Sequence, residues 1–139
     1  MAAPPTAQPT GGTTKRLLPL LGLVVSACAT LPVQLGPHLD VAHRVEIADH
    51  LIPGLVVLAV SATVLVMTRR APVPGFAMLA AGLLVTLAGL WMVATHLPLV
   101  AQAGRHDAPW GPAIYHSASA VLVLVFGLVW TTVSWADAG

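Results

Sequence analysis

Histidine is the residue type in this chain whose number and placement could support chemistry. The sequence contains six histidines, and all of them lie in or beside two short polar stretches between apolar segments. Neutral imidazole binds haem iron, copper and zinc, so a histidine-lined end on an apolar helical bundle predicts a metal or haem site. The six residues are His38, His43, His50, His96, His106 and His116.

The composition places these histidines in a membrane protein. Of 139 residues, 57% are hydrophobic and only 8% are charged, and the mean hydropathy is +0.86. A spanning helix needs about 20 mostly apolar residues, so we predict an all-α integral membrane four-helix bundle over residues 15–139. Residues 1–14, rich in Ala, Pro, Thr and Gly, are expected to form a disordered tail. The four apolar segments cover approximately residues 17–35, 47–67, 75–97 and 113–135.

The positive charges predict the orientation of the bundle. Lys15, Arg16, Arg69 and Arg70 fall on one side when four spans are drawn. The positive-inside rule makes that side cytoplasmic, which puts both termini in the cytoplasm and the histidine-rich loops on the outer side. The net charge of +1 offers no basic surface for nucleic acid.

The cysteine content limits the kind of cofactor attachment. Cys28 is the single cysteine and lies within the first apolar segment. The chain therefore cannot form an intrachain disulfide or a Cys-x-x-Cys-His attachment, and any haem would be held without a covalent bond.

An internal repeat relates the two halves of the chain. Pro32 and Pro98 both stand near the end of an apolar segment, and both are followed at the same distance by a histidine, His50 or His116. This spacing favours two tandem helical hairpins with those two histidines at equivalent depth on the second and fourth helices.

The most polar stretch of the chain leads directly into the second apolar segment. If a helix already begins near Asp40, then Asp40, His43, Glu46 and His50 share one of its faces, because residues three and four apart lie on the same side. That face would carry two imidazoles and two carboxylates, the ligand types that suit copper or zinc as well as haem iron.

The same stretch resembles a motif of the heme A synthase family, whose members fuse two four-helix bundles that each bind haem near the outer end. In that family Glu-x-x-His-Arg opens the second helix of a bundle, and a histidine in an apolar context opens the fourth. The segment from Asp40 through His43 to Arg44 matches the first element with Asp in place of Glu, and His116 matches the second. The resemblance implies haem b held by His43 and His116.

The family motif and the internal repeat predict different histidines as the second ligand beside His116. The family motif favours His43, whereas the internal repeat favours His50. In the haem interpretation Arg44 and Arg105 would pair with propionates, and Asp40 would orient the ligand imidazole. His38 and His106 are expected in solvated loops, and His96 is expected to satisfy a local hydrogen bond or face headgroups.

Three functions follow from these observations. The leading one is a small haem b protein that serves electron transfer or haem handling within a larger membrane complex. The second is a structural accessory subunit without a cofactor, and the third is a copper site that uses His43, His50 and nearby carboxylates. Complete heme A synthesis would need a second bundle from a homodimer or another subunit, so a non-catalytic or accessory role is expected.

Overall fold

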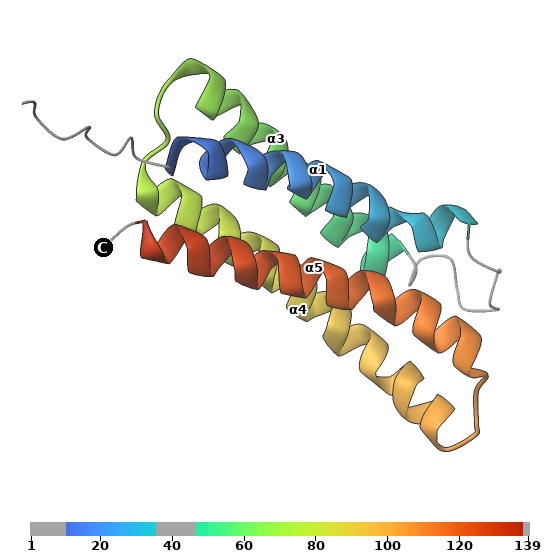
Figure 1. Cartoon of the computed structure of the whole chain (residues 1–139). Helices are drawn as coiled ribbons and strands as arrows, with labels where there is room; N and C mark the ends of the chain where they lie inside the picture. The colour runs from blue at the N-terminus through green and yellow to red at the C-terminus, as the bar shows by residue number, and fades with distance from the viewer. Residues whose placement is uncertain (1–10, 36–46, 138–139) are drawn as a thin grey trace, which may run out of the picture.

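A computed structural model of the chain describes residues 11–35 and 47–137. These residues form an all-α bundle of four long helices, as the sequence predicts (Figure 1). A five-residue π-helical turn, η1, directly precedes the second of them. The elements are α1 (Gly11–Leu35), η1 (Ile47–Leu51), α3 (Ile52–Arg70), α4 (Gly75–Gly104) and α5 (Trp110–Ala136).

Three of the helical segments are long and apolar enough to cross a membrane. They are Ala48–Arg70, Gly75–Gly104 and Trp110–Ala136. The apolar part of α1, Arg16–Leu31, is shorter. Large apolar side chains such as Phe76 and Trp135 are exposed on the outside of the bundle, which suits a lipid environment. The structure thus confirms an integral membrane helical bundle.

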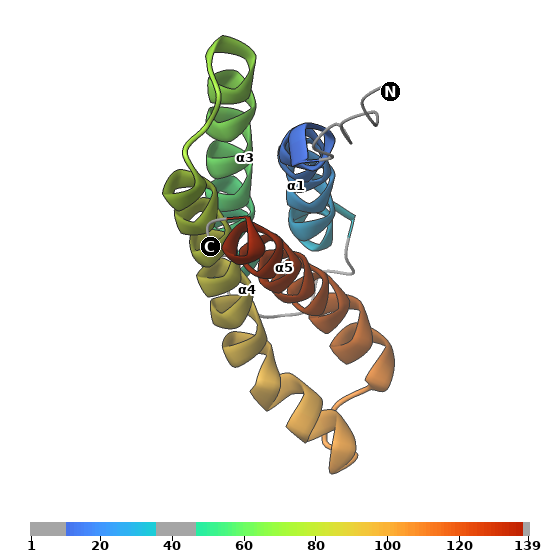
Figure 2. The same cartoon turned by 60° about the vertical axis from the view of Figure 1, so that its left-hand side comes forward.

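The helices pair in two hairpin-like units. α1 lies beside α3, and α4 lies beside α5, with the most extensive contact between α4 and α5. The start of α1, the connection between α3 and α4, and the end of α5 all lie at one end of the bundle (Figure 1). At the other end the α4–α5 hairpin extends past α3 (Figure 2).

Small residues allow the close approach of α4 and α5. A Cβ atom added at Gly89 would collide with the backbone of Leu124, and one added at Gly82 would lie 2.8 Å from the backbone nitrogen of Thr131. Close packing of this kind holds helices together in lipid, where the hydrophobic effect does not drive their association. The contact fixes α4 and α5 as one rigid unit.

Helix boundaries differ from the predicted ones at several places, and three differences bear on the shape of the bundle. α1 begins at Gly11, within the segment expected to be a tail; α4 continues through Pro98 to Gly104; and α5 begins at Trp110. A proline removes one backbone hydrogen bond, a cost that the long apolar α4 tolerates in a membrane setting. The connection between α4 and α5 is therefore shorter than the predicted loop.

Candidate metal centre

His50 enters the bundle from the π-helical turn before α3. The turn covers Ile47–Leu51, and Pro53 follows in the first turn of α3. Pro53 has no backbone N–H to donate to a carbonyl one turn earlier. The regular α-helical hydrogen bonding is therefore interrupted in the turn that contains His50. Such wide turns are frequent at functional sites, and this one leaves the His50 side chain fully buried.

A hydrogen bond between α1 and α3 supports the backbone beside His50. The hydroxyl of Ser26 donates to the carbonyl of Gly54 at 2.8 Å, and both residues are buried. Gly54 lies one helical turn after His50, so this bond ties the start of α3 to α1.

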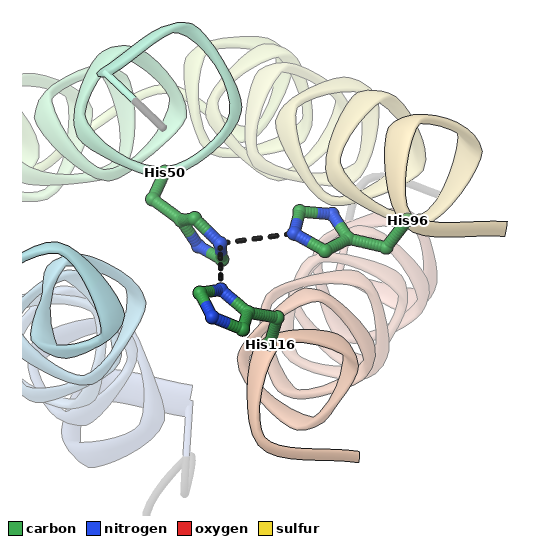
Figure 3. A group of neighbouring side chains, drawn as sticks. All are labelled: His50, His96 and His116. Atoms are coloured by element: carbon green, nitrogen blue, oxygen red, sulfur yellow. Dashed lines mark hydrogen bonds between the residues drawn. The ribbon is translucent and has the colours of Figure 1, made fainter. Parts of the chain in front are cut away.

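His96 projects from α4 with its ring orientation fixed by the helix itself. Its Nδ1 atom lies 2.6 Å from the carbonyl oxygen of Met92, one turn earlier. A carbonyl oxygen only accepts hydrogen bonds, so Nδ1 carries the proton and donates it. In the neutral ring the lone pair is then on Nε2, the nitrogen that faces the neighbouring histidines (Figure 3). Metal-bound histidines typically have their second nitrogen anchored in this way.

His116 projects from α5 toward the same point. Its Nδ1 lies 3.1 Å from Nε2 of His50, and its backbone carbonyl accepts a hydrogen bond from the Ser119 hydroxyl at 2.9 Å. The side chain is 4% exposed. His116 thus reaches the site from a third element of the bundle.

The three imidazoles form one compact buried group, which we call the histidine triad: His50, His96 and His116. One nitrogen from each ring can be chosen so that all three lie within 4.8 Å of one another. Figure 3 shows that the rings come from three elements and converge on a common centre. Among the described residues the triad is the group of ligand side chains whose spacing could hold a metal ion.

Hydrogen bonding alone does not account for the contacts of His50. Its Nε2 lies 2.9 Å from Nε2 of His96 and 3.1 Å from Nδ1 of His116. An imidazole nitrogen has either one proton or one lone pair in the ring plane, so it makes one well-directed hydrogen bond. Three nitrogens that face one point are instead suited to share a cation.

Two of the three nitrogen separations are close to those expected around a shared cation. Zinc–nitrogen bonds of about 2.0–2.1 Å at tetrahedral angles would place ligand nitrogens about 3.3 Å apart. The two observed contacts are a few tenths of an ångström shorter than this. The three nitrogens all lie within 4.8 Å of one another, so a shared ion would also require the imidazole rings to turn toward a common centre.

The structure brings together two of the predicted site residues, His50 and His116, which follow from the internal repeat. It adds His96, for which the sequence predicts a local hydrogen bond; that bond is present, and the ring also joins the triad. Its position continues the buried face of α4. His96 follows Val85, Gly89 and Met92 at intervals of three or four, and all of these residues are buried.

The other predicted site residues are not part of the triad. Arg105 lies after the end of α4 and pairs with Asp107 at 3.4 Å, and both side chains are mostly exposed. His106, beside it, is exposed and adopts a left-handed backbone conformation with φ of 64°. Asp40, His43 and Arg44 lie outside the described residues.

Comparisons with protein-family models, with curated proteins and with solved structures find no match. The chemistry of the histidine triad is therefore the guide to function.

Proposed function

We propose that this chain is a membrane protein that binds one transition metal ion through His50, His96 and His116. The observation that carries the proposal is the convergence of three buried imidazoles from three elements on one point. Polar side chains at membrane depth are costly and tend to be functional. A bound ion would give all three rings a common partner in an otherwise apolar interior.

The ligand type narrows the choice of metal to copper or zinc. Imidazole suits zinc, copper, iron and nickel, whereas magnesium and calcium prefer oxygen ligands. Copper(II) and zinc also stand at or near the top of the affinity order for nitrogen sites. Within the described residues the triad contains no carboxylate or thiolate, so the ligand set is three neutral nitrogens.

Counted over the described residues, three protein ligands leave at least one coordination position open. Structural zinc sites are usually closed by four protein ligands, whereas sites that exchange a ligand keep a position free. The triad therefore supports a role in metal handling or electron transfer in the membrane more than a role as a structural clamp. Its place near one end of the spans, within the first residues of Ala48–Arg70, would give the ion a short route to the surface.

Haem b is the second candidate, supported by the resemblance to one half of a heme A synthase. A six-coordinate haem has its axial nitrogens on opposite faces of the porphyrin, whereas the nitrogens of His50 and His116 are in direct contact at 3.1 Å. Haem held by this pair would require α3 and α5 to separate. The family motif implies a different ligand pair, His116 and His43. Binding of haem by that pair stays a prediction.

The decisive experiment measures metal and haem in the same purified sample. The chain is produced with copper, zinc and haem supplied, purified in detergent, and analysed by elemental mass spectrometry and by its reduced-minus-oxidised absorption spectrum. We expect about one copper or zinc ion per chain. Alanine in place of His50, His96 or His116 should each lower metal affinity by at least about 100-fold, since losing even an outer-shell partner of a ligand costs about 10–100-fold.

The control replaces a histidine outside the triad. His106→Asn keeps a residue that tolerates the left-handed conformation at that position, and it should bind metal like the wild type. A folded wild-type protein that carries neither metal nor haem would refute the proposal and favour a structural subunit. A haem spectrum without copper or zinc would favour the second candidate.

A further inference from the structure

Three arginine side chains gather around a pocket at the end of the bundle opposite the histidine triad. Arg16 comes from α1, and Arg69 and Arg70 come from the last turn of α3. Together with Thr68 and residues 71–73 they line a pocket of about 420 Å³. All three arginines are exposed, so the pocket opens to the surroundings of the protein.

The described residues provide no carboxylate partner for these three cations. Their acidic side chains are Asp49, Asp107 and Asp137, and none of them lines the pocket, although Asp137, after the end of α5, lies at the same end of the bundle. Asp107 pairs with Arg105 at the far end of the bundle. The last carbonyls of α3 contribute only the partial negative charge of a helix C-terminus. The gathered guanidinium groups therefore favour an external anion.

The pocket lies where one membrane-length helix ends and the next begins, the level at which phospholipid headgroups would meet the protein. The segment Ala48–Arg70 is long and apolar enough to cross the bilayer and ends at Arg70, and the next helix that can cross it begins at Gly75. Between them Val73 is buried against the apolar core. The pocket lining thus combines basic and apolar side chains, the polarity that a headgroup and its first acyl carbons require.

We propose that this pocket binds the phosphate group of an anionic ligand at the membrane surface, namely an anionic phospholipid headgroup or free phosphate. Guanidinium groups form paired hydrogen bonds to phosphate oxygens, and arginines from two helices can hold one phosphate from two sides. Basic pockets between membrane helices are known to bind anionic headgroups. The site is independent of the metal centre and requires no metal to form.

The test measures lipid binding to the purified full chain by native mass spectrometry. Phosphatidylglycerol is the anionic probe, phosphatidylcholine is the zwitterionic probe, and inorganic phosphate is the competitor. We expect phosphatidylglycerol to bind at least tenfold more tightly than phosphatidylcholine. Each of Arg16→Gln, Arg69→Gln and Arg70→Gln should weaken that binding by about fivefold, following the contribution of one arginine near a charged surface.

Arg105→Gln is the matched control, because it removes an exposed arginine at the opposite end of the bundle. It should leave binding unchanged, and circular dichroism checks that every variant keeps its helical content. If millimolar inorganic phosphate displaces the bound lipid, free phosphate is the ligand. If it does not displace the lipid, the lipid headgroup is the ligand. Equal binding of the two lipids without phosphate binding, or equal losses in Arg105→Gln and the pocket variants, would overturn the proposal.

Discussion

Nε2 of His50 lies 3.1 Å from Nδ1 of His116, a residue 66 positions later in the chain. The same separation relates Pro32 to Pro98. The contact brings together two histidines that occupy the same position in the two halves of the sequence, which is consistent with two tandem hairpins packed side by side. His96 has no counterpart in this relationship, because the position 66 residues earlier is Thr30. The third histidine of the triad therefore breaks the symmetry of the pair.

The first prediction concerns the protonation of His96 in the metal-free protein. Its Nδ1 donates to the Met92 carbonyl at 2.6 Å, so the neutral ring should be the tautomer with its proton on Nδ1 and its lone pair on Nε2. Nitrogen-15 chemical shifts of labelled histidine in detergent or lipid will distinguish the two tautomers. The His96 signals are assigned as those that disappear from the spectrum of the His96→Gln variant. A His96 signal with the proton on Nε2 would contradict this geometry.

The second prediction is that acid releases the metal. Each imidazole must be unprotonated to bind, so metal binding competes with up to three protons. The metal content should be constant near pH 8 and fall steeply as the pH approaches about 5, the range in which histidine ordinarily gains its charge. Elemental analysis after equilibration at each pH measures the ratio of metal to protein. A constant ratio across this range would indicate a different ligand set.

Length and hydropathy are sufficient to predict the helices of this chain. A segment such as residues 75–97 is too apolar and too long for any element other than a membrane helix. The ends of the helices are less predictable, because membrane helices tolerate proline and glycine at positions that would end a helix in a soluble protein. Pro98 resembles a helix terminator in the sequence, yet α4 continues to Gly104. That difference makes the connection short and extends the α4–α5 hairpin.

The candidate site could be predicted only in part. The repeat identifies His50 and His116 because it requires nothing but equal spacing. His96 needs knowledge of which face of α4 is buried, and that face is set by contacts with α5 at residues such as Gly89. The π-helical turn at His50 is also beyond sequence patterns, since it depends on how Pro53 interrupts the hydrogen-bond ladder.

The third prediction tests the close contact between α4 and α5. Gly89→Ala adds a methyl group that collides with the backbone of Leu124, and backbone cannot move aside as a flexible side chain can. We expect a loss of about 1–3 kcal/mol in the free energy of unfolding, as for other overpacked interiors. Thermal denaturation in detergent would measure it. Gly104→Ala is the control, since nothing lies within 4 Å of its added Cβ; equal stability of the two variants would contradict the prediction.

The fourth prediction concerns the bond between α1 and α3. Ser26→Ala removes the donor to the Gly54 carbonyl and should lower stability by about 0.6 kcal/mol, the average for such bonds between membrane helices. Because the bond lies one turn from His50, metal affinity should fall as well. Thr132→Ala, which removes an exposed hydroxyl bonded within its own helix, should change neither quantity. Wild-type metal affinity in Ser26→Ala would show that α1 does not position the triad.

The last prediction assigns the two ends of the bundle to the two sides of the membrane. The arginine-bearing end, with Arg16, Arg69 and Arg70, should face the cytoplasm, because short loops rich in arginine and lysine are retained there. Cys28→Ala removes the single native cysteine, and new cysteines are then placed at the exposed positions Ala71 and Gly104. An impermeant thiol reagent added to intact cells should label Gly104→Cys, whereas Ala71→Cys should react only after permeabilisation. The reverse pattern would place the histidine triad near the cytoplasmic side, where a bound metal ion would exchange with the cytoplasmic pool.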